Sequence, residues 1–218
     1  MLIGLAAFPS IACGRGNTEP TAASAQNEPM ATASQGLEKF RSTTEPFEIQ
    51  YPSEWEKTEG FAGTPMKKVS DHFLGPEIDG MQVSITISPQ EIKNWVELDD
   101  FLKDRFVSVG AEPPKPLSEL NDSNISESLR KFKNIKVGGQ TTITLHSSSA
   151  YDRPKTVKRQ YGLGAFFVTN PKNDKDVKRG WVIALNYPGA LELPENKAQL
   201  DSLYNDFYAM LQSFKLLQ

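Results

Sequence analysis

The sequence is poor in the residues that most enzymes use, and it has no long hydrophobic run. Its 218 residues include one cysteine, Cys13, and two histidines, His72 and His146. A lone thiol cannot form a disulfide within the chain, so packing alone must hold the fold. No apolar run approaches the roughly 20 residues of a membrane-spanning helix. The patterns G-x-x-x-x-G-K-[ST], G-x-G-x-x-G and G-x-S-x-G are missing too, and we expect no enzymatic activity.

Cys13 ends the only apolar stretch near the N-terminus. Residues 2–12, LIGLAAFPSIA, have the length of a signal-peptide core. The segment 10–13, SIAC, is similar to a bacterial lipobox, in which the cysteine sulfur receives a diacylglycerol, although serine stands where that motif usually has leucine. An ordinary cleaved signal peptide and a fortuitous apolar start are the alternatives. We predict that residues 1–13 are a signal peptide ending in a lipidated Cys13, so that the protein is exported and anchored to a membrane.

The next segment, residues 14–36, has almost nothing to bury. It consists mainly of Ala, Ser, Thr, Gln, Asn, Gly and Pro, a composition that stays disordered and gives reach. We predict a polar tether over 14–36 and one globular domain over 37–218, a length that suits a single hydrophobic core. We expect this domain to be monomeric.

The domain shows both strand and helix periodicities. Apolar residues alternate with polar ones in several short runs, as in half-buried strands, whereas two segments repeat them at helical spacing. Gly138-Gly139 between two alternating runs predicts a hairpin. Strands are expected over 47–51, 81–87, 132–137, 141–145, 156–168 and 181–185, helices over 98–109 and 194–214, and a surface loop over 111–129. This order predicts an α+β fold, an antiparallel sheet flanked by helices.

Several of these segments resemble the PsbP family, the extrinsic lumenal proteins of photosystem II and their cyanobacterial lipoprotein relatives. The matching segments are FEIQYPSEW at 47–55, VSITISP at 83–89, KVGGQTTITL at 136–145 and LQSF at 211–214. The resemblance implies an α-β-α sandwich and an accessory protein that docks on photosystem II, facing the thylakoid lumen or the periplasm. Envelope lipoproteins of the DcrB type share this sandwich, and they imply an alternative: binding of a small ligand, metal or protein partner with no photosynthetic role.

The histidines offer little evidence of a catalytic or metal site. His146 follows Leu145 in an alternating strand, on the opposite face, which predicts an exposed strand histidine. His72 directly follows Asp71, with Asp79 nearby, and such ligands could hold a divalent ion such as calcium. The spacing fits no established metal motif, so an ordinary polar loop is the alternative. We retain Asp71, His72 and Asp79 as candidate metal ligands.

Charge is distributed unevenly along the chain. Residues 130–179 hold twelve basic and three acidic residues, although the whole chain has a net charge of -3. Such a segment could speed docking on an acidic membrane complex or on anionic lipids, and a solvated surface is the alternative. An exported protein does not meet nucleic acid. The predicted docking residues are Arg130, Lys131, Lys133, Lys136, Arg153, Lys155, Lys158, Arg159, Lys172, Lys175, Lys178 and Arg179.

Overall fold

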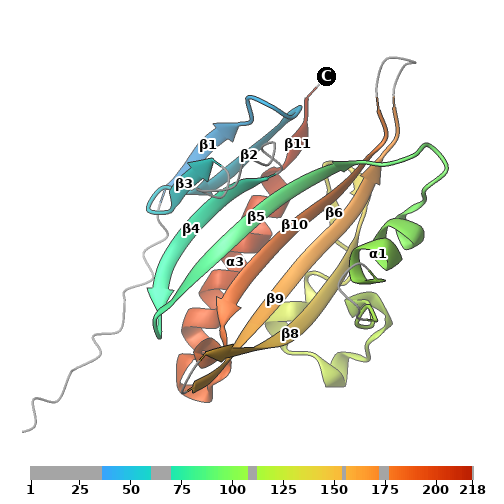
Figure 1. Cartoon of the computed structure of the whole chain (residues 1–218). Coiled ribbons are helices and arrows are strands. Elements are labelled where there is room, and N and C mark those ends of the chain that lie inside the picture. The colour runs from blue at the N-terminus through green and yellow to red at the C-terminus, as the bar shows by residue number, and fades with distance from the viewer. Residues whose placement is uncertain (1–35, 60–69, 108–111, 154–155, 172–176, 218) are drawn as a thin grey trace, which may run out of the picture. The chain divides into compact units, whose positions relative to one another are not determined.

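The computed structural model describes residues 36–217, apart from 60–69, 108–111, 154–155 and 172–176. A six-stranded sheet of order β3-β4-β5-β10-β9-β8 forms the centre of the domain, and every neighbouring pair is antiparallel (Figure 1). The expected α+β class is therefore confirmed. The strands are β3 (Glu56–Glu59), β4 (Asp71–Ile78), β5 (Met81–Glu91), β8 (Ile143–Arg153), β9 (Thr156–Thr169) and β10 (Arg179–Pro188).

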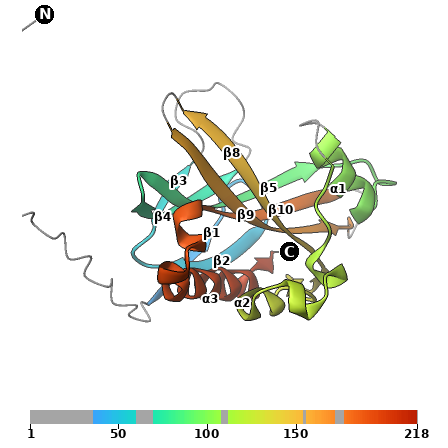
Figure 2. The same cartoon turned by 90° about the horizontal axis from the view of Figure 1, so that it is seen from below.

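Helices lie on both sides of this sheet. The long helix α3 (Lys197–Ser213) and the short α2 (Glu127–Arg130) lie on one side, and α1 (Leu98–Val107) lies on the other (Figure 2). A second sheet of order β1-β2-β11 and the hairpin β6-β7 complete the fold. The remaining elements are β1 (Leu37–Arg41), β2 (Phe47–Pro52), β6 (Lys136–Val137), β7 (Gln140–Thr141), β11 (Lys215–Leu216), η1 (Leu117–Glu119), η2 (Asp122–Asn124), η3 (Gly189–Glu192) and η4 (Pro194–Asn196).

The main hydrophobic core fills the space between α3 and one face of the large sheet. Strands β5, β9 and β10 each contribute alternate residues to it, as the period of two requires. Helix α3 contributes residues three and four positions apart, which share one face of a helix. The buried residues of α3 are Leu200, Leu203, Tyr204, Phe207, Met210 and Leu211.

A smaller cluster holds α1 against the opposite face of the sheet. Phe101 and Leu102 pack there with Phe166 of β9 and Val182 of β10. Gly180 allows this approach, because a Cβ atom at that position would lie 2.3 Å from the Phe101 ring. Helix α1 can therefore pack closely against β10, because Gly180 has no side chain.

The structure differs from the predicted elements in several places, and strands β1 and β3 were not expected. Strand β4 was not expected, and its sequence includes Gly75-Pro76. Proline cannot donate to a strand ladder, and the β4–β5 register shifts between Leu74 and Glu77. The expected strand over 132–137 is wrong except for its last two residues, since a turn follows α2 there. The Gly138-Gly139 hairpin is confirmed, with positive φ at both glycines.

The predicted signal peptide, Cys13 and most of the tether lie outside the described residues. None of the helices in the described part of the chain combines the length and the apolar character needed to cross a membrane.

Candidate functional site

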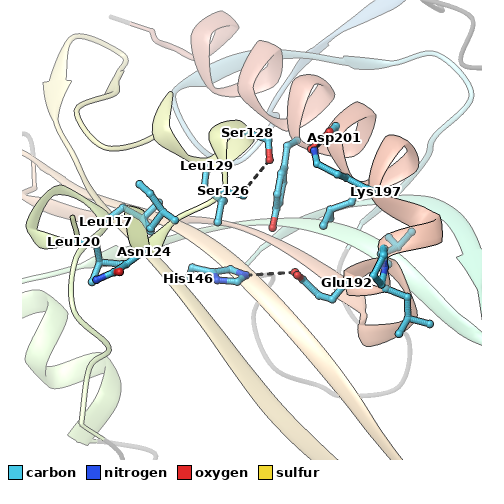
Figure 3. A pocket seen from close by; sticks show the side chains of 16 residues that line it. Leu117, Leu120, Asn124, Ser126, Ser128, Leu129, His146, Glu192, Lys197 and Asp201 are labelled. Carbon is cyan, nitrogen blue, oxygen red and sulfur yellow. Dashed lines mark hydrogen bonds and ion pairs between the residues drawn. The ribbon is translucent and has the colours of Figure 1, made fainter. Parts of the chain in front are cut away.

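A pocket of about 510 Å³ opens beside α3, between the 117–129 segment and the turn that leads into the helix (Figure 3). Strand β8 supplies His146 at its base, η3 supplies Glu192, and α3 supplies Tyr204. Aliphatic side chains make up most of the walls. The principal ones are Leu117, Leu120, Ile125, Leu129, Leu191 and Leu200.

The base of the pocket is a hydrogen-bonded cluster centred on Tyr187 of β10. The Tyr187 hydroxyl oxygen lies 2.8 Å from His146 Nε2, 2.7 Å from Glu192 Oε1 and 2.5 Å from the Tyr204 hydroxyl oxygen. Tyr187 and Tyr204 are buried, whereas the His146 and Glu192 side chains retain 23% and 32% exposure. We call these four residues the tyrosine cluster. Its two partly exposed members line the pocket, so the cluster joins the core to an accessible surface.

The positions of the protons in the cluster follow from its donors and acceptors. A carboxylate only accepts, so the single proton of Tyr187 is donated to Glu192. Tyr204 and His146 Nε2 must then both donate to the Tyr187 oxygen, which has two lone pairs. Tyr187 thereby makes all the hydrogen bonds it can, and neutral His146 carries its hydrogen on Nε2 and leaves Nδ1 as an acceptor.

Ring stacking holds the imidazole of His146 in the orientation in which Nε2 faces the Tyr187 hydroxyl. Tyr161 of β9 lies beside it, with the ring centres 5.8 Å apart and the planes inclined by 19°. Tyr161 in turn stacks on Tyr187 at 5.8 Å and 17°. These three rings come from neighbouring strands on one face of the sheet, where cross-strand neighbours meet.

Burial keeps the imidazole and the two phenols of the cluster in their neutral forms. It lowers the pKa of His146, and the nearby Glu192 carboxylate opposes this effect. Burial is also the main cause that raises the pKa values of Tyr187 and Tyr204 far above that of a free tyrosine. Neither phenol ionises near neutral pH, so the cluster serves as a hydrogen-bonding platform rather than as a source of a phenolate.

An ion pair borders the pocket on α3. Lys197 Nζ pairs with the Asp201 carboxylate one turn along the helix. Burial acts to raise the pKa of Asp201, but hydrogen bonds from Lys197 and Ser128 lower it overall. Asp201 thereby compensates the charge of Lys197 at the surface of the helix.

The structure does not bring the three candidate metal ligands together. Asp71 and His72 are consecutive in β4 and therefore point to opposite faces of the sheet. Asp71 is buried and accepts a hydrogen bond from Ser42, whereas His72 contacts Ser70 and Thr86. Asp79 lies in the turn that precedes β5, with a positive φ. Among the described residues, no group of three His, Cys, Asp or Glu could hold a metal ion.

Three of the predicted docking residues are ion-paired within the protein. Lys133 pairs with Asp122 at 2.7 Å, Arg179 with Glu45 at 3.0 Å, and Lys178 with Glu97 at 2.9 Å. Lys178 is only 2% exposed and cannot meet a partner. Lys131 contacts Asn205 and the rings of Phe132 and Tyr208. The exposed members are Arg130, Lys136 and Arg159, while the side chains of Arg153, Lys155, Lys158, Lys172 and Lys175 lie outside the described part.

The sequence reasoning missed the tyrosine cluster. His146 does lie opposite Leu145, but the face it occupies is covered by η3 and α3, so it is half-buried rather than exposed. Tyr187, Glu192 and Tyr204 fit ordinary strand, turn and helix patterns. The one available signal was a polar histidine in a strand whose partner strands carry tyrosines.

No family model matches the chain, and no curated protein matches it in sequence. Three solved structures have a similar fold at low sequence identity. A protein from Bacteroides thetaiotaomicron has 13% identity and a TM-score of 0.41, covering 84% of this chain, which spans only 49% of that protein. LpqN, involved in cell envelope biogenesis of Mycobacterium tuberculosis, has 9% identity and a TM-score of 0.48, covering 84% and 93% of the two chains. Cyanobacterial PsbP from Synechocystis sp. PCC 6803 has 15% identity and a TM-score of 0.35, covering 85% and 95%. These likenesses concern the fold alone.

Proposed function

We propose that this protein is a non-enzymatic, lipid-anchored accessory protein on the extracytoplasmic side of a membrane, and that it binds a small ligand in the pocket beside α3. The observation that carries this proposal is the pocket itself, with aliphatic walls and the tyrosine cluster at its base. Its volume of about 510 Å³ lies within the usual range of ligand sites, and a few fixed polar groups in an apolar hollow are typical of them.

The same geometry favours binding over catalysis. A nucleophile needs a base that can take its proton, but His146 Nε2 already donates to a buried phenol whose pKa is strongly raised. Elsewhere in the described part of the chain, Ser70 and Thr86 contact the two ring nitrogens of His72. The carboxylate of Asp71 points to the other face of the sheet.

A pocket-filling variant tests the proposal. Ser128 lines the pocket and is half-buried, so Ser128→Trp places an indole in the opening. We expect the wild-type protein to bind a neutral apolar fluorophore, such as N-phenyl-1-naphthylamine, and the variant to lose most of that signal. Ser118→Trp is the matched control, because Ser118 is exposed and does not line the pocket. Equal binding by both variants would show that the fluorophore binds elsewhere.

Docking on a membrane complex is the second candidate function, and the sequence resemblance names photosystem II as that complex. The excess of basic residues in 130–179 favours it. We expect reversal of the exposed Lys136 and Arg159 to glutamate to weaken sedimentation with photosystem II membranes, and added salt to do the same. Reversal of the exposed Lys103 and Lys115 is the control. If both pairs behave alike, the basic segment is only a solvated surface.

A further inference from the structure

The four residues of the tyrosine cluster offer acceptors to a ligand but no free donor. The proton of Tyr187 is donated to Glu192, and the proton of Tyr204 and the Nε2 hydrogen of His146 are donated to Tyr187. What remains is acceptor capacity: the second carboxylate oxygen of Glu192, and Nδ1 of neutral His146. Within the described part of the chain, Glu192 Oε2 has no hydrogen-bond partner, and the side chain is 32% exposed toward the pocket opening.

The charged groups around the opening also favour a cationic ligand. Glu192 and Asp201 contribute two carboxylates, whereas Lys197 is the only ammonium group among the described residues that line the pocket. Lys197 is held by Asp201, so none of the described residues that line the pocket offers Glu192 an unpaired ammonium group. His146 does not balance it, because burial favours its neutral form. A cation entering the pocket would therefore meet a net negative charge beside an aromatic ring.

We propose that the pocket selects an amphipathic amine: a molecule whose ammonium head donates to Glu192 and whose aliphatic tail lies among Leu120, Leu129 and Leu200. This inference rests on the proposed function, since it names the ligand class of the same pocket. An ammonium group is a donor without acceptors, so it complements a base that has acceptors without donors.

Three probes with one tail and different heads test the selection. The full-length protein is titrated with octylammonium, octanol and octanoate at pH 7, and the methyl signals of Leu120, Leu129 and Leu200 report on binding by NMR. We expect octylammonium to bind about tenfold more tightly than octanoate, because a hydrogen bond to a charged group is worth roughly one order of magnitude in affinity or more. Glu192→Gln keeps the acceptor for Tyr187 but removes the charge. It should weaken octylammonium about tenfold and leave octanol unchanged.

Glu195→Gln is the matched control, since Glu195 lies three residues away, is exposed and does not line the pocket. It should leave all three affinities unchanged, whereas an equal loss in both variants would mean nonspecific attraction and would overturn the amine assignment. If octanoate or octanol binds the leucine methyls as tightly as octylammonium, the head-group assignment is wrong while the pocket remains a binding site. If no probe shifts those methyl signals, both the amine assignment and the proposed function fail.

Discussion

The hydroxyl oxygens of Tyr187 and Tyr204 lie 2.5 Å apart between β10 and α3, and both side chains are almost fully buried. Their positions in the hydrogen-bonded cluster differ. Among the described residues, the Tyr187 hydroxyl has three partners, whereas the Tyr204 hydroxyl bonds to Tyr187 alone. The two tyrosines should therefore contribute unequally to stability, although each loses a single oxygen atom on substitution by phenylalanine.

We expect Tyr204→Phe to lower the free energy of unfolding by about 1 kcal/mol, the net value of one hydrogen bond. Tyr187→Phe should cost about 2 kcal/mol or more, because it also leaves the buried Tyr204 hydroxyl without an acceptor. In the Tyr187→Phe background, adding Tyr204→Phe should cost less than it does alone. Urea denaturation of the three variants measures these differences. Equal costs for the two single variants would contradict Tyr187 as the centre of the cluster.

Gly180→Ala should destabilise the contact between α1 and the sheet. The added Cβ would lie 2.3 Å from the Phe101 ring, so helix or ring must shift. Overpacking of this kind costs about 1–3 kcal/mol, which denaturation would measure. Gly162→Ala is the control, because its nearest contact would be an ordinary 3.5 Å to Ser147. In a Phe101→Ala background, Gly180→Ala should hardly change the free energy of unfolding. If it still lowers that free energy, the strain does not come from the Phe101 ring.

Both histidines should make the fold less stable as the pH falls. Burial is the main cause that lowers the pKa values of His72 and His146 in the folded protein, whereas in the unfolded chain they stay near 6.5. Below about pH 6.5 the unfolded state binds more protons, so the free energy of unfolding decreases, by at most about 1.4 kcal/mol per pH unit for each group. The loss ends once the pH passes below the folded-state pKa values.

Denaturation of the wild-type protein and of a His72→Gln/His146→Gln variant at pH 7 and pH 5.5 measures this effect. Few carboxylates with ordinary pKa values titrate in that interval. We expect the wild type to lose stability over this range and the variant to lose much less. Parallel behaviour of the two proteins would show that other groups set the pH dependence.

Cys13→Ser should release the protein from membranes if the cysteine carries the lipid anchor. Acyl chains provide the membrane affinity in this arrangement, and no other part of the predicted tether would replace them. Fractionation of broken cells, with the intact mass of the purified wild type, measures the effect. A variant that still sediments with membranes, together with a wild type without acyl mass, would contradict the prediction.

Sequence periodicity predicted the parts of the fold in which one pattern runs undisturbed. The apolar stripe of α3 and the run in β10 belong to this group, as does the Gly138-Gly139 turn. Strand β4 escaped prediction because Gly75-Pro76 interrupts its alternation. Gly75 is needed there, since a Cβ would lie 2.8 Å from the Trp55 indole. Gly75 therefore interrupts the sequence pattern of the strand and also allows the strand to pack against Trp55.

The candidate site was harder to predict than the fold, because its members come from strands, a turn and a helix that only the tertiary structure brings together. Tyrosine is common in half-buried strands and helices, so Tyr187 and Tyr204 carried no distinguishing pattern. Alternation alone places His146 on a face of the sheet but does not say what covers that face. The covering element, η3, follows β10 and lies more than forty residues further along the chain than His146.

The small sheet also constrains the order in which the molecule can form. Its last strand, β11, pairs with β2, joining Lys215 to Glu48 and Leu216 to Phe47. Contacts between such distant residues require a large loop to close first, which slows folding. A growing chain cannot add β11 to this sheet until Leu216 has been synthesised. Until then β2 has only β1 as a partner within the small sheet, so the edge of β2 that will bind β11 remains unpaired.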